Sequence, residues 1–507
     1  MNRQKYAIRN ILIMLSTYIV TTIISFVVRA IFVRQLGSQY LGLNGVFTSI
    51  LSVLAISDLG MESVFAFLLY KPLAQNDNNS IRNFIALFRK VYTFVGGFIF
   101  ITGSSIIPFL PLIIGEQGNE LSHVTLIYFI LLVNSASSYL FTYNRTILNA
   151  NQKNYIITGV NFLLVTGVNL LQIVFLYLFD SMVIYVSLFL ISTLTTNIIL
   201  SRIVLKGYPF LHSLPKHPKL SNEDKKTLLH NTVGGLSNKL GSIIVFASDN
   251  ILLSIFVNLT TVGLYSNYTM ILNSLSGLIQ KVFGTLTAGV GNLSVQAPER
   301  AAKVFKQLNF YITGIAFFLA PQLLTMLRPL VVFWLGEDYV LSQYIVLLII
   351  INFVIQISRA PALVYIDAYG LQWVQKWKSV IESILNIGFS LVALSLFHLG
   401  LIGILLGTIG STTLFVLWYE PLIVLNYSLN LKSRERFQVL CQILIEKLWL
   451  LIPTIVAWLI MHFFHGSGIL FLLQLMIVNL IISIILFYII FGRRSETKSL
   501  YYMFVKK

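Results

Sequence analysis

The sequence predicts an all-α integral membrane protein with about 14 transmembrane helices. Of its 507 residues, 57% are hydrophobic and only 10% are charged, and the mean hydropathy is +0.83. Runs of about 20 apolar residues, each long enough to cross a hydrocarbon core of about 30 Å as a helix, recur along the whole chain. No soluble core needs that much apolar surface, so the composition excludes a soluble globular protein.

The apolar runs give the expected spans in order. On one side of the membrane the loops between these spans are basic. An even number of spans places both termini on the same side of the membrane. The expected spans are residues 11–33, 43–66, 92–114, 124–144, 155–179, 182–201, 232–257, 262–284, 308–330, 341–362, 379–398, 400–422, 447–464 and 468–491.

The positive charge reports orientation. The chain carries 35 Lys and Arg against 18 Asp and Glu, a formal net charge of +17. Most of the cations fall in alternate loops, whereas the intervening loops are short and neutral or acidic, which is the positive-inside pattern of a plasma-membrane protein. We therefore expect both termini in the cytoplasm and anionic lipid headgroups, rather than nucleic acid, as the partner of these charges. The single cysteine, Cys441, excludes an internal disulfide.

The basic N-terminus resembles a signal peptide for about ten residues. Its apolar run lacks a small-x-small cleavage site and continues past Arg29. We therefore expect a retained first helix.

An internal repeat organises the chain. Residues 40–51 (YLGLNGVFTSIL) align without a gap with residues 261–272 (TVGLYSNYTMIL), and five positions, among them Gly42 and Gly263, are identical. This offset joins the first span to the seventh and the second to the eighth. Repeats that are six helices apart point the same way, which is the parallel-repeat plan of several secondary transporters. The sequence thus predicts two parallel six-helix repeats, each contributing one copy to a central cleft, plus two extra C-terminal helices.

The polar segment PKHPKLSNEDKK, between the sixth and seventh spans, is typical of a linker. The expected domains follow from it. They are an N-lobe of residues 1–205, a cytoplasmic linker of 206–231, a C-lobe of 232–426, and a last part, 427–507, with a cytoplasmic loop, spans 13 and 14 and a basic tail.

Several stretches resemble bacterial polysaccharide-transporter flippases of the multidrug/oligosaccharidyl-lipid/polysaccharide superfamily. They are FVRQLGSQYLGLNGVFTSILSVLAISDLGMESV (32–64), YKPLA (70–74), SYLFTYNRTILNANQK (138–153), SDNILLS (248–254), VGLYSNY (262–268) and GVGNL (289–293). The resemblance covers residues 3 to about 430. It implies a V-shaped, two-lobed transporter that flips a polyprenyl-pyrophosphate-linked oligosaccharide, of the capsule, exopolysaccharide or O-antigen type, from the inner to the outer leaflet. Expected partners are that lipid-linked oligosaccharide, membrane lipids and the polysaccharide polymerase machinery.

Charged residues inside the expected spans are functional candidates, because each costs a few kcal/mol in a helix centre. The 221-residue offset places Asp249 at the level of residue 28, so Arg29 and Asp249 are expected to approach each other at the outer mouth. By the same argument Lys281 is expected to face Asp58 and Glu62 at the inner mouth. The alternative for each is an ion pair within its own lobe that only makes burial tolerable.

The anionic substrate implied by the resemblance needs cations and hydrogen-bonding groups. Arg can bind phosphate oxygens bidentately, whereas Lys acts as a point charge. The candidate residues for pyrophosphate are Arg29, Lys239 and Arg359, and those for the sugars are Tyr265, Asn267, Tyr268 and Asn44. Aromatic residues near a helix end are more often plain interfacial anchors.

Other functions leave signals that the sequence lacks. It has no GxxxxGK[ST] loop, HExxH or GxSxG motif, so we expect no ATP hydrolysis, no enzyme activity, no metal and no cofactor. The alternatives are a multidrug exporter on the same fold, a lipid II-type flippase and, more remotely, a membrane polysaccharide polymerase. A polymerase would need a large outer loop, and the expected outer loops are only a few residues long.

Overall fold

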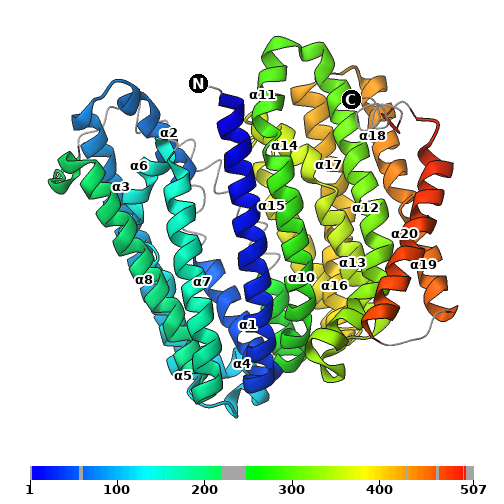
Figure 1. Cartoon of the computed structure of the whole chain (residues 1–507), viewed down its shortest axis with the longest axis horizontal. Coiled ribbons are helices and arrows are strands. Elements are labelled where there is room, and N and C mark those ends of the chain that lie inside the picture. The colour runs from blue at the N-terminus through cyan, green and yellow to red at the C-terminus, as the bar shows by residue number, and fades with distance from the viewer. Residues whose placement is uncertain are drawn as a thin grey trace. The chain divides into compact units, whose positions relative to one another are not determined.

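The computed structural model describes residues 3–55, 61–151, 153–218, 247–429, 431–463, 468–494 and 496–497 (Figure 1). The regular elements in these ranges are all helices. The chain divides into two compact units, Met1–Gly263 and Leu264–Lys507. Each unit is a helical bundle and is described by itself.

The first unit contains the helices from α1 to the start of α10. Their bounds are α1 Arg3–Leu54, α2 Met61–Ala74, α3 Asn78–Ile106, η2 Ile107–Phe109, α4 Leu110–Asn119, α5 Val124–Ser137, α6 Thr142–Ala150, α7 Asn154–Phe179, α8 Met182–Gly207 and η3 Pro209–His212, followed by a helix at Ala247–Phe256 and by α10 at Leu259–Gly284.

The second unit contains the rest of α10 and the helices after it. Their bounds are α11 Thr287–Gln296, α12 Pro298–Leu335, η4 Glu337–Tyr339, α13 Gln343–Ile357, α14 Ala360–Ala368, α15 Lys376–Ser395, α16 Gly400–Ser411, η5 Thr412–Val416, α17 Leu417–Ile423, η6 Val424–Ser428, α18 Ser433–Leu448, α19 Leu451–Phe463 and α20 Ile469–Phe491.

The prediction of a helical multi-pass membrane protein is confirmed, but the count of fourteen spans is not. Within the described residues, ten helices are long and apolar enough to cross a membrane, or eleven if the pair α5 and α6, bent by 44°, forms one span. The first expected span, 11–33, and residues 43–54 of the second lie in α1. Gly37, with φ 81° and ψ 175°, breaks this helix into two segments, a backbone conformation that glycine adopts without steric cost.

The two ends of the first unit differ in charge. At one end, the Arg82 guanidinium of α3 donates to the Ser213 carbonyl at 2.8 Å, and the Lys153 ammonium lies 5.4 Å from the centre of the Tyr208 ring. At the other end, the Ser122 amide donates to the Tyr40 hydroxyl at 3.3 Å. The acidic residues of this second end, Glu116 and Glu120, belong to α4 and its C-cap. The basic and acidic loops therefore gather at opposite ends of this unit.

Within the first unit, α1 and the start of α10 approach each other closely at the shared glycines Gly42 and Gly263. A Cβ atom on Gly42 would lie 1.9 Å from the Leu259 carbonyl oxygen, and one on Gly263 would lie 2.1 Å from the Ser38 carbonyl oxygen. Ser38 and Leu259 are separated by the same 221 residues as the glycines. The contact is therefore reciprocal, as expected of a pseudo-twofold crossing in which small residues let two backbones approach closely.

The two C-terminal helices pack against α12 in the second unit. The Asn479 amide of α20 donates to the Thr325 hydroxyl at 3.0 Å, and the Gln322 amide donates to the Met476 carbonyl at 3.2 Å. Aromatic rings from both helices interlock beside these bonds, with Phe487 5.6 Å from Phe317 between ring centres. The extra helices are thus built into the core of this unit.

The division of the chain at Gly263 falls later than the expected 206–231 linker. The described contacts explain why residues 247–263 join the first unit. The Asn250 amide donates to the Ser49 hydroxyl at 3.0 Å, and the Ser254 hydroxyl donates to the Ile113 carbonyl at 2.7 Å. Residues 219–231 of the expected linker lie outside the described residues, so the domain boundaries stay a prediction.

Candidate functional site

Arg29 lies on the first segment of α1, eight residues before the break at Gly37. Its guanidinium is half-buried and interacts electrostatically with the Tyr185 side chain of α8. The Tyr185 ring in turn packs edge-on against Phe32, with 4.7 Å between ring centres. A cation therefore lies about 12 Å before the break at Gly37, within a membrane-spanning segment.

Asp249 lies in the same unit, on the helix Ala247–Phe256, and its side chain is buried. This helix ends at Phe256, about 10 Å beyond Asp249 at 1.5 Å per residue. Because Ser38 packs against Gly263 and Gly42 against Leu259, the ends of the two segments lie at a similar level. Arg29 and Asp249 thus occupy comparable levels, and their ion pair stays a prediction.

Of the residues expected at the inner mouth, the structure describes Lys281. Lys239 and Asp58 lie outside the described residues, as does the side chain of Glu62. Lys281 lies in the last turn of α10 and is half-buried, and Asn44 lies half-buried on α1. The expected approach of Lys281 to Asp58 and Glu62 therefore stays a prediction.

The three α10 residues proposed to contact sugars are buried in this structure. Tyr268 and Asn267 are fully buried, and Tyr265 is nearly so. The Tyr268 hydroxyl accepts a hydrogen bond from the Leu341 amide at 3.0 Å, so it helps to fix the segment that precedes α13. In this conformation the three side chains present almost no surface to a ligand.

The described residues include a buried network of charged side chains in the second unit. Arg359 donates to both carboxylate oxygens of Glu420, at 3.0 Å and 2.7 Å, and also lies 3.5 Å from Glu382. Lys378 lies 2.7 Å from Glu420 and 3.9 Å from Glu382. The side chain of Glu420 is 0% exposed. Two cations and two carboxylates thus neutralise each other in a place where an isolated charge would be costly.

Irregular helix geometry brings these four residues together. Arg359 lies at the break between α13 and α14, two residues before Pro361, which occupies the first turn of α14. Glu420 directly precedes Pro421, and π-helical turns flank this part of α17 at Thr412–Val416 and Val424–Ser428. Proline lacks the amide that would continue the helical hydrogen bonding, and π turns are common at functional sites. Lys378 and Glu382 are one turn apart on α15.

Further charged residues extend this network toward α18 and the C-terminal segment. The Lys447 ammonium donates to the Ser358 carbonyl at 3.4 Å, directly beside Arg359. Glu446 pairs with Arg494 and accepts a hydrogen bond from Gln442 at 2.9 Å. The network therefore ties α14, α15, α17 and α18 together.

The structure gives Arg359 different partners from those expected. Its guanidinium binds Glu420, Glu382 and Gln356, so it has little capacity left for a pyrophosphate. Lys378, Glu382 and Glu420 are not among the site residues predicted from the sequence, and Lys378 falls one residue before the expected span 379–398. The four-residue spacing of Lys378 and Glu382 was the readable signal, because it places both on one helix face.

Among the described residues, no group of three or more His, Cys, Asp or Glu side chains could hold a metal ion. The buried carboxylates of Glu420 and Glu382 are already bound by cations. The chemistry of this network is therefore that of an internal, charge-balanced set of ion pairs.

Comparison with known proteins identifies the family. A family model described as a polysaccharide biosynthesis protein matches residues 7–287, more than half of the chain. A comparison with curated proteins found no match.

Solved structures share the fold across nearly the whole chain. A lipid II flippase, MurJ, in an inward closed conformation has a TM-score of 0.62 at 15% identity, and the match covers 94% of this chain and 99% of that chain. The eukaryotic MATE transporter AtDTX14 has a TM-score of 0.52 at 13% identity, with coverage of 84% and 95%. An inward-facing MATE family transporter of the MOP superfamily has a TM-score of 0.50 at 13% identity, with coverage of 86% and 95%. The chain therefore belongs to the polysaccharide biosynthesis protein family and has the fold of the multi-pass membrane transporters of the MOP superfamily.

Proposed function

We propose that this protein is a flippase that moves a polyprenyl-pyrophosphate-linked oligosaccharide repeat unit from the inner to the outer leaflet of the plasma membrane by alternating access. The observation that carries the proposal is the match of residues 7–287 to the polysaccharide biosynthesis family. The fold shared with a lipid II flippase supports a lipid-linked substrate. The repeat unit belongs to a capsule, exopolysaccharide or O-antigen, and a polysaccharide polymerase uses it on the outer side.

Arg29 is the described residue best suited to the pyrophosphate. It is a half-buried guanidinium within a spanning segment, and the planar fork of Arg matches phosphate oxygens bidentately. Lys239 supplies a second cation in this proposal. Arg359 is left out because its donors are bound to carboxylates. Asn44, Tyr265, Asn267 and Tyr268 would contact the sugars only in a state in which the three α10 residues become exposed.

Depletion tests the function directly. Without the protein, lipid-linked repeat units should still form but should accumulate on the cytoplasmic leaflet, and surface polysaccharide should stop. The measurement is the leaflet distribution of the lipid-linked glycan, read by its accessibility to an external glycosidase. Normal arrival on the outer leaflet in depleted cells without a second flippase would disprove the proposal.

Substitution of Arg29 tests its role in binding. Arg29→Ala should abolish transport, whereas Arg29→Lys should keep part of it because the point charge remains. Arg34→Ala is the matched control, because Arg34 is exposed and lies five residues further along the same segment. Full transport by the double variant Arg29→Ala/Asp249→Ala would show instead that Arg29 only balances Asp249.

We also propose that both termini and the 202–231 and 427–447 loops are cytoplasmic. The separation of basic and acidic ends in the first unit supports this orientation. In a Cys441→Ser background, an impermeant thiol reagent added outside should modify a cysteine placed at Glu116 or Asp338 but not one at Lys219. Labelling at position 219 from outside would reverse the orientation.

The alternative substrates are outcomes of the same experiments. Transport of a cationic drug that is independent of Arg29 would favour a multidrug exporter. Accumulation of lipid II, rather than of an oligosaccharide repeat unit, on depletion would favour a lipid II-type flippase.

A further inference from the structure

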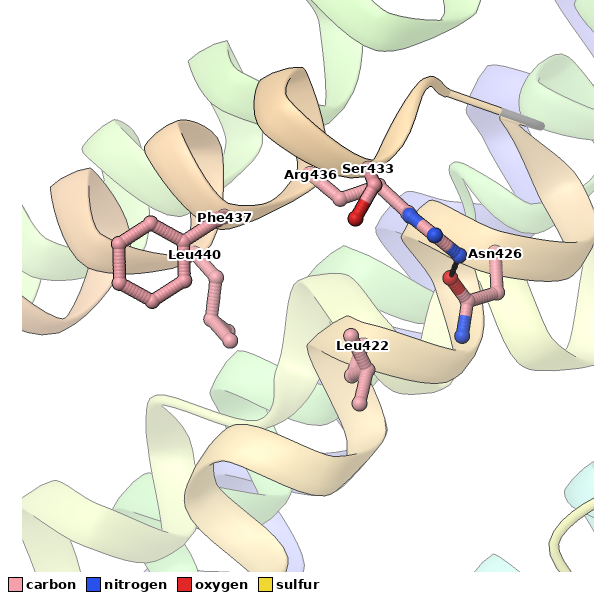
Figure 2. Close-up of a pocket in the computed structure, with 6 residues that line it drawn as sticks. All are labelled: Leu422, Asn426, Ser433, Arg436, Phe437 and Leu440. Carbon is pink, nitrogen blue, oxygen red and sulfur yellow. Dashed lines mark hydrogen bonds between the residues drawn. The ribbon is translucent and has the colours of Figure 1, made fainter.

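A pocket of about 310 Å³ opens between the end of the α17–η6 segment and the first turns of α18 (Figure 2). It lies wholly within the second unit. Its lining residues are Leu422, Asn426, Ser433, Arg436, Phe437 and Leu440. In Figure 2 the polar side chains Arg436, Ser433 and Asn426 lie together on one side, Phe437 and Leu440 lie on the other, and Leu422 lies below and between the two groups.

The polar side of the pocket suits a phosphate. The Arg436 guanidinium donates to the Asn426 side-chain oxygen, which fixes the orientation of its planar fork. Among the described residues, the Asn426 side-chain oxygen is the one hydrogen-bond partner of the Arg436 guanidinium. The other N–H groups of this guanidinium can therefore bind an anion. The Ser433 hydroxyl lies on the same side (Figure 2). A guanidinium held in place loses little freedom when it binds phosphate oxygens bidentately.

The apolar side of the pocket suits a hydrocarbon chain. The Phe437 ring is 68% exposed, and Leu422 and Leu440 lie beside it in the lining. A soluble anion would leave this apolar surface uncovered, whereas a lipid that placed its headgroup on Arg436 would cover it with an acyl chain. The exposed neighbours Lys432 and Arg434 add positive charge, and such basic clusters beside a spanning helix attract anionic lipids.

We propose that this pocket binds an anionic membrane phospholipid, with its phosphate on Arg436, Ser433 and Asn426 and an acyl chain along Phe437 and Leu440. The proposal does not rest on the flippase function, because none of these residues is among the proposed substrate contacts. The bound lipid would fill the space between η6 and α18 and so hold the loop before α18 against the second unit.

Native mass spectrometry of the full chain in detergent, titrated with phosphatidylglycerol, tests the proposal. Arg436→Gln should weaken binding of the first lipid about tenfold, which corresponds to about 1.4 kcal/mol. Arg434→Gln is the matched control, since Arg434 is exposed, lies on the same helix and is not among the lining residues. Equal losses in the two variants would overturn the site.

Further arms separate the phospholipid from other anions. Phosphatidylcholine with the same acyl chains should bind more weakly, and inorganic phosphate should not displace phosphatidylglycerol. Displacement of phosphatidylglycerol by inorganic phosphate would show that the pocket is a simple anion site. Tighter binding of a polyprenyl phosphate would show that it binds the transported lipid. Either result would overturn the proposal. If Arg436→Gln does not fold, Phe437→Ala is the variant that tests the site. The exposed Phe437 ring is not needed for packing, and its removal should still weaken phosphatidylglycerol binding severalfold.

Discussion

The two units hold their helices together by different means. In the first, the α1 segment after Gly37 meets residues 250–263 through glycines, an amide and a hydroxyl. In the second, α14, α15 and α17 meet through two cations and two carboxylates. Apolar burial discriminates poorly between neighbours in lipid, so specific packing needs either close backbone approach or polar bonds. The loss of stability in a variant should therefore depend on whether the substitution removes a buried charge, a close backbone contact or a neutral hydrogen bond.

Removal of Glu420 should have the largest effect, because it strands two cations at once. Glu420→Ala leaves Arg359 and Lys378 without their nearest carboxylate in a fully buried site, which costs about 3 to 5 kcal/mol when a buried pair is broken. Thermal unfolding of the purified protein should show a large fall in melting temperature. Replacing Arg359, Lys378, Glu382 and Glu420 together with apolar residues of similar volume should recover much of that loss.

The matched control is an exposed ion pair in the same unit. Glu299 lies 3.9 Å from Arg300, and both side chains are more than 70% exposed. Exposed pairs contribute about 1 kcal/mol or less, so Glu299→Ala should leave the melting temperature nearly unchanged. If Glu420→Ala proved as mild as Glu299→Ala, the network would not stabilise the second unit.

The glycine crossing should give the next largest effect. Gly42→Ala or Gly263→Ala places a methyl group within about 2 Å of a backbone carbonyl oxygen, which the neighbouring helix can relieve only by moving. Overpacking of this kind costs about 1 to 3 kcal/mol. We expect each variant to lower the melting temperature, and we expect the double variant to cost less than the sum, because both methyl groups widen the same crossing.

Gly167 provides the control for this crossing. It lies in α7, and a Cβ on it would meet nothing within 4 Å. Gly167→Ala should therefore be neutral or slightly stabilising, since alanine favours a helix interior over glycine by about 1 kcal/mol. Equal behaviour of Gly42→Ala and Gly167→Ala would mean that the two repeat copies do not pack tightly.

The fold could be predicted from the sequence because lipid imposes a simple rule of length and polarity. The apolar runs and the alternating basic loops were enough for the membrane class. The identity of Gly42 and Gly263 is visible in the repeat, but the close approach of the backbones at these glycines is not. The span count was not predictable to the same degree. Among the described residues ten or eleven helices qualify as spans, and residues 232–246 of the expected seventh span lie outside the described ranges, so the number of spans stays a prediction.

The charged network shows where the sequence falls short. Arg359 and Glu420 are 61 residues apart on separate helices, and no periodicity relates them. A charged side chain within a span needs a partner, but choosing that partner requires the breaks next to Pro361 and Pro421. The four-residue spacing of Lys378 and Glu382 is visible in the sequence, yet Lys378 falls just before the expected span 379–398, because the helix begins at Lys376 with residues less apolar than those that follow.

Loss of a hydrogen bond between two uncharged side chains on different helices should lower the stability less than Glu420→Ala or the glycine substitutions. Asn479 is buried on α20, and its amide donates to the Thr325 hydroxyl of α12 at 3.0 Å. Such bonds in membrane proteins average about 0.6 kcal/mol, with a maximum of about 1.7. A double-mutant cycle with Asn479→Leu and Thr325→Val should give a coupling energy in this range. A coupling as large as the loss in Glu420→Ala would remove the distinction between charged and neutral contacts.

The smallest effect should come from a charge that is not buried at all. Asp77 caps α3 by accepting from the Ser80 hydroxyl at 2.6 Å and from the Ser80 and Asn79 amides at 3.0 Å and 3.1 Å. These bonds, that from the Ser80 hydroxyl first, hold the pKa of the Asp77 carboxyl below its ordinary value. A lowered pKa in the folded protein means that the stabilisation is present above the ordinary pKa and is lost as the pH falls through the folded value. Asp77→Asn keeps an acceptor but cannot titrate, so the difference in melting temperature between wild type and this variant should shrink on acidification from about pH 7 to pH 3. A difference in melting temperature that stayed constant over this range would show that the Asp77 charge adds nothing to the cap. Exposed charges would then contribute even less to the stability of this protein, and the contrast with its buried charged network would be sharper.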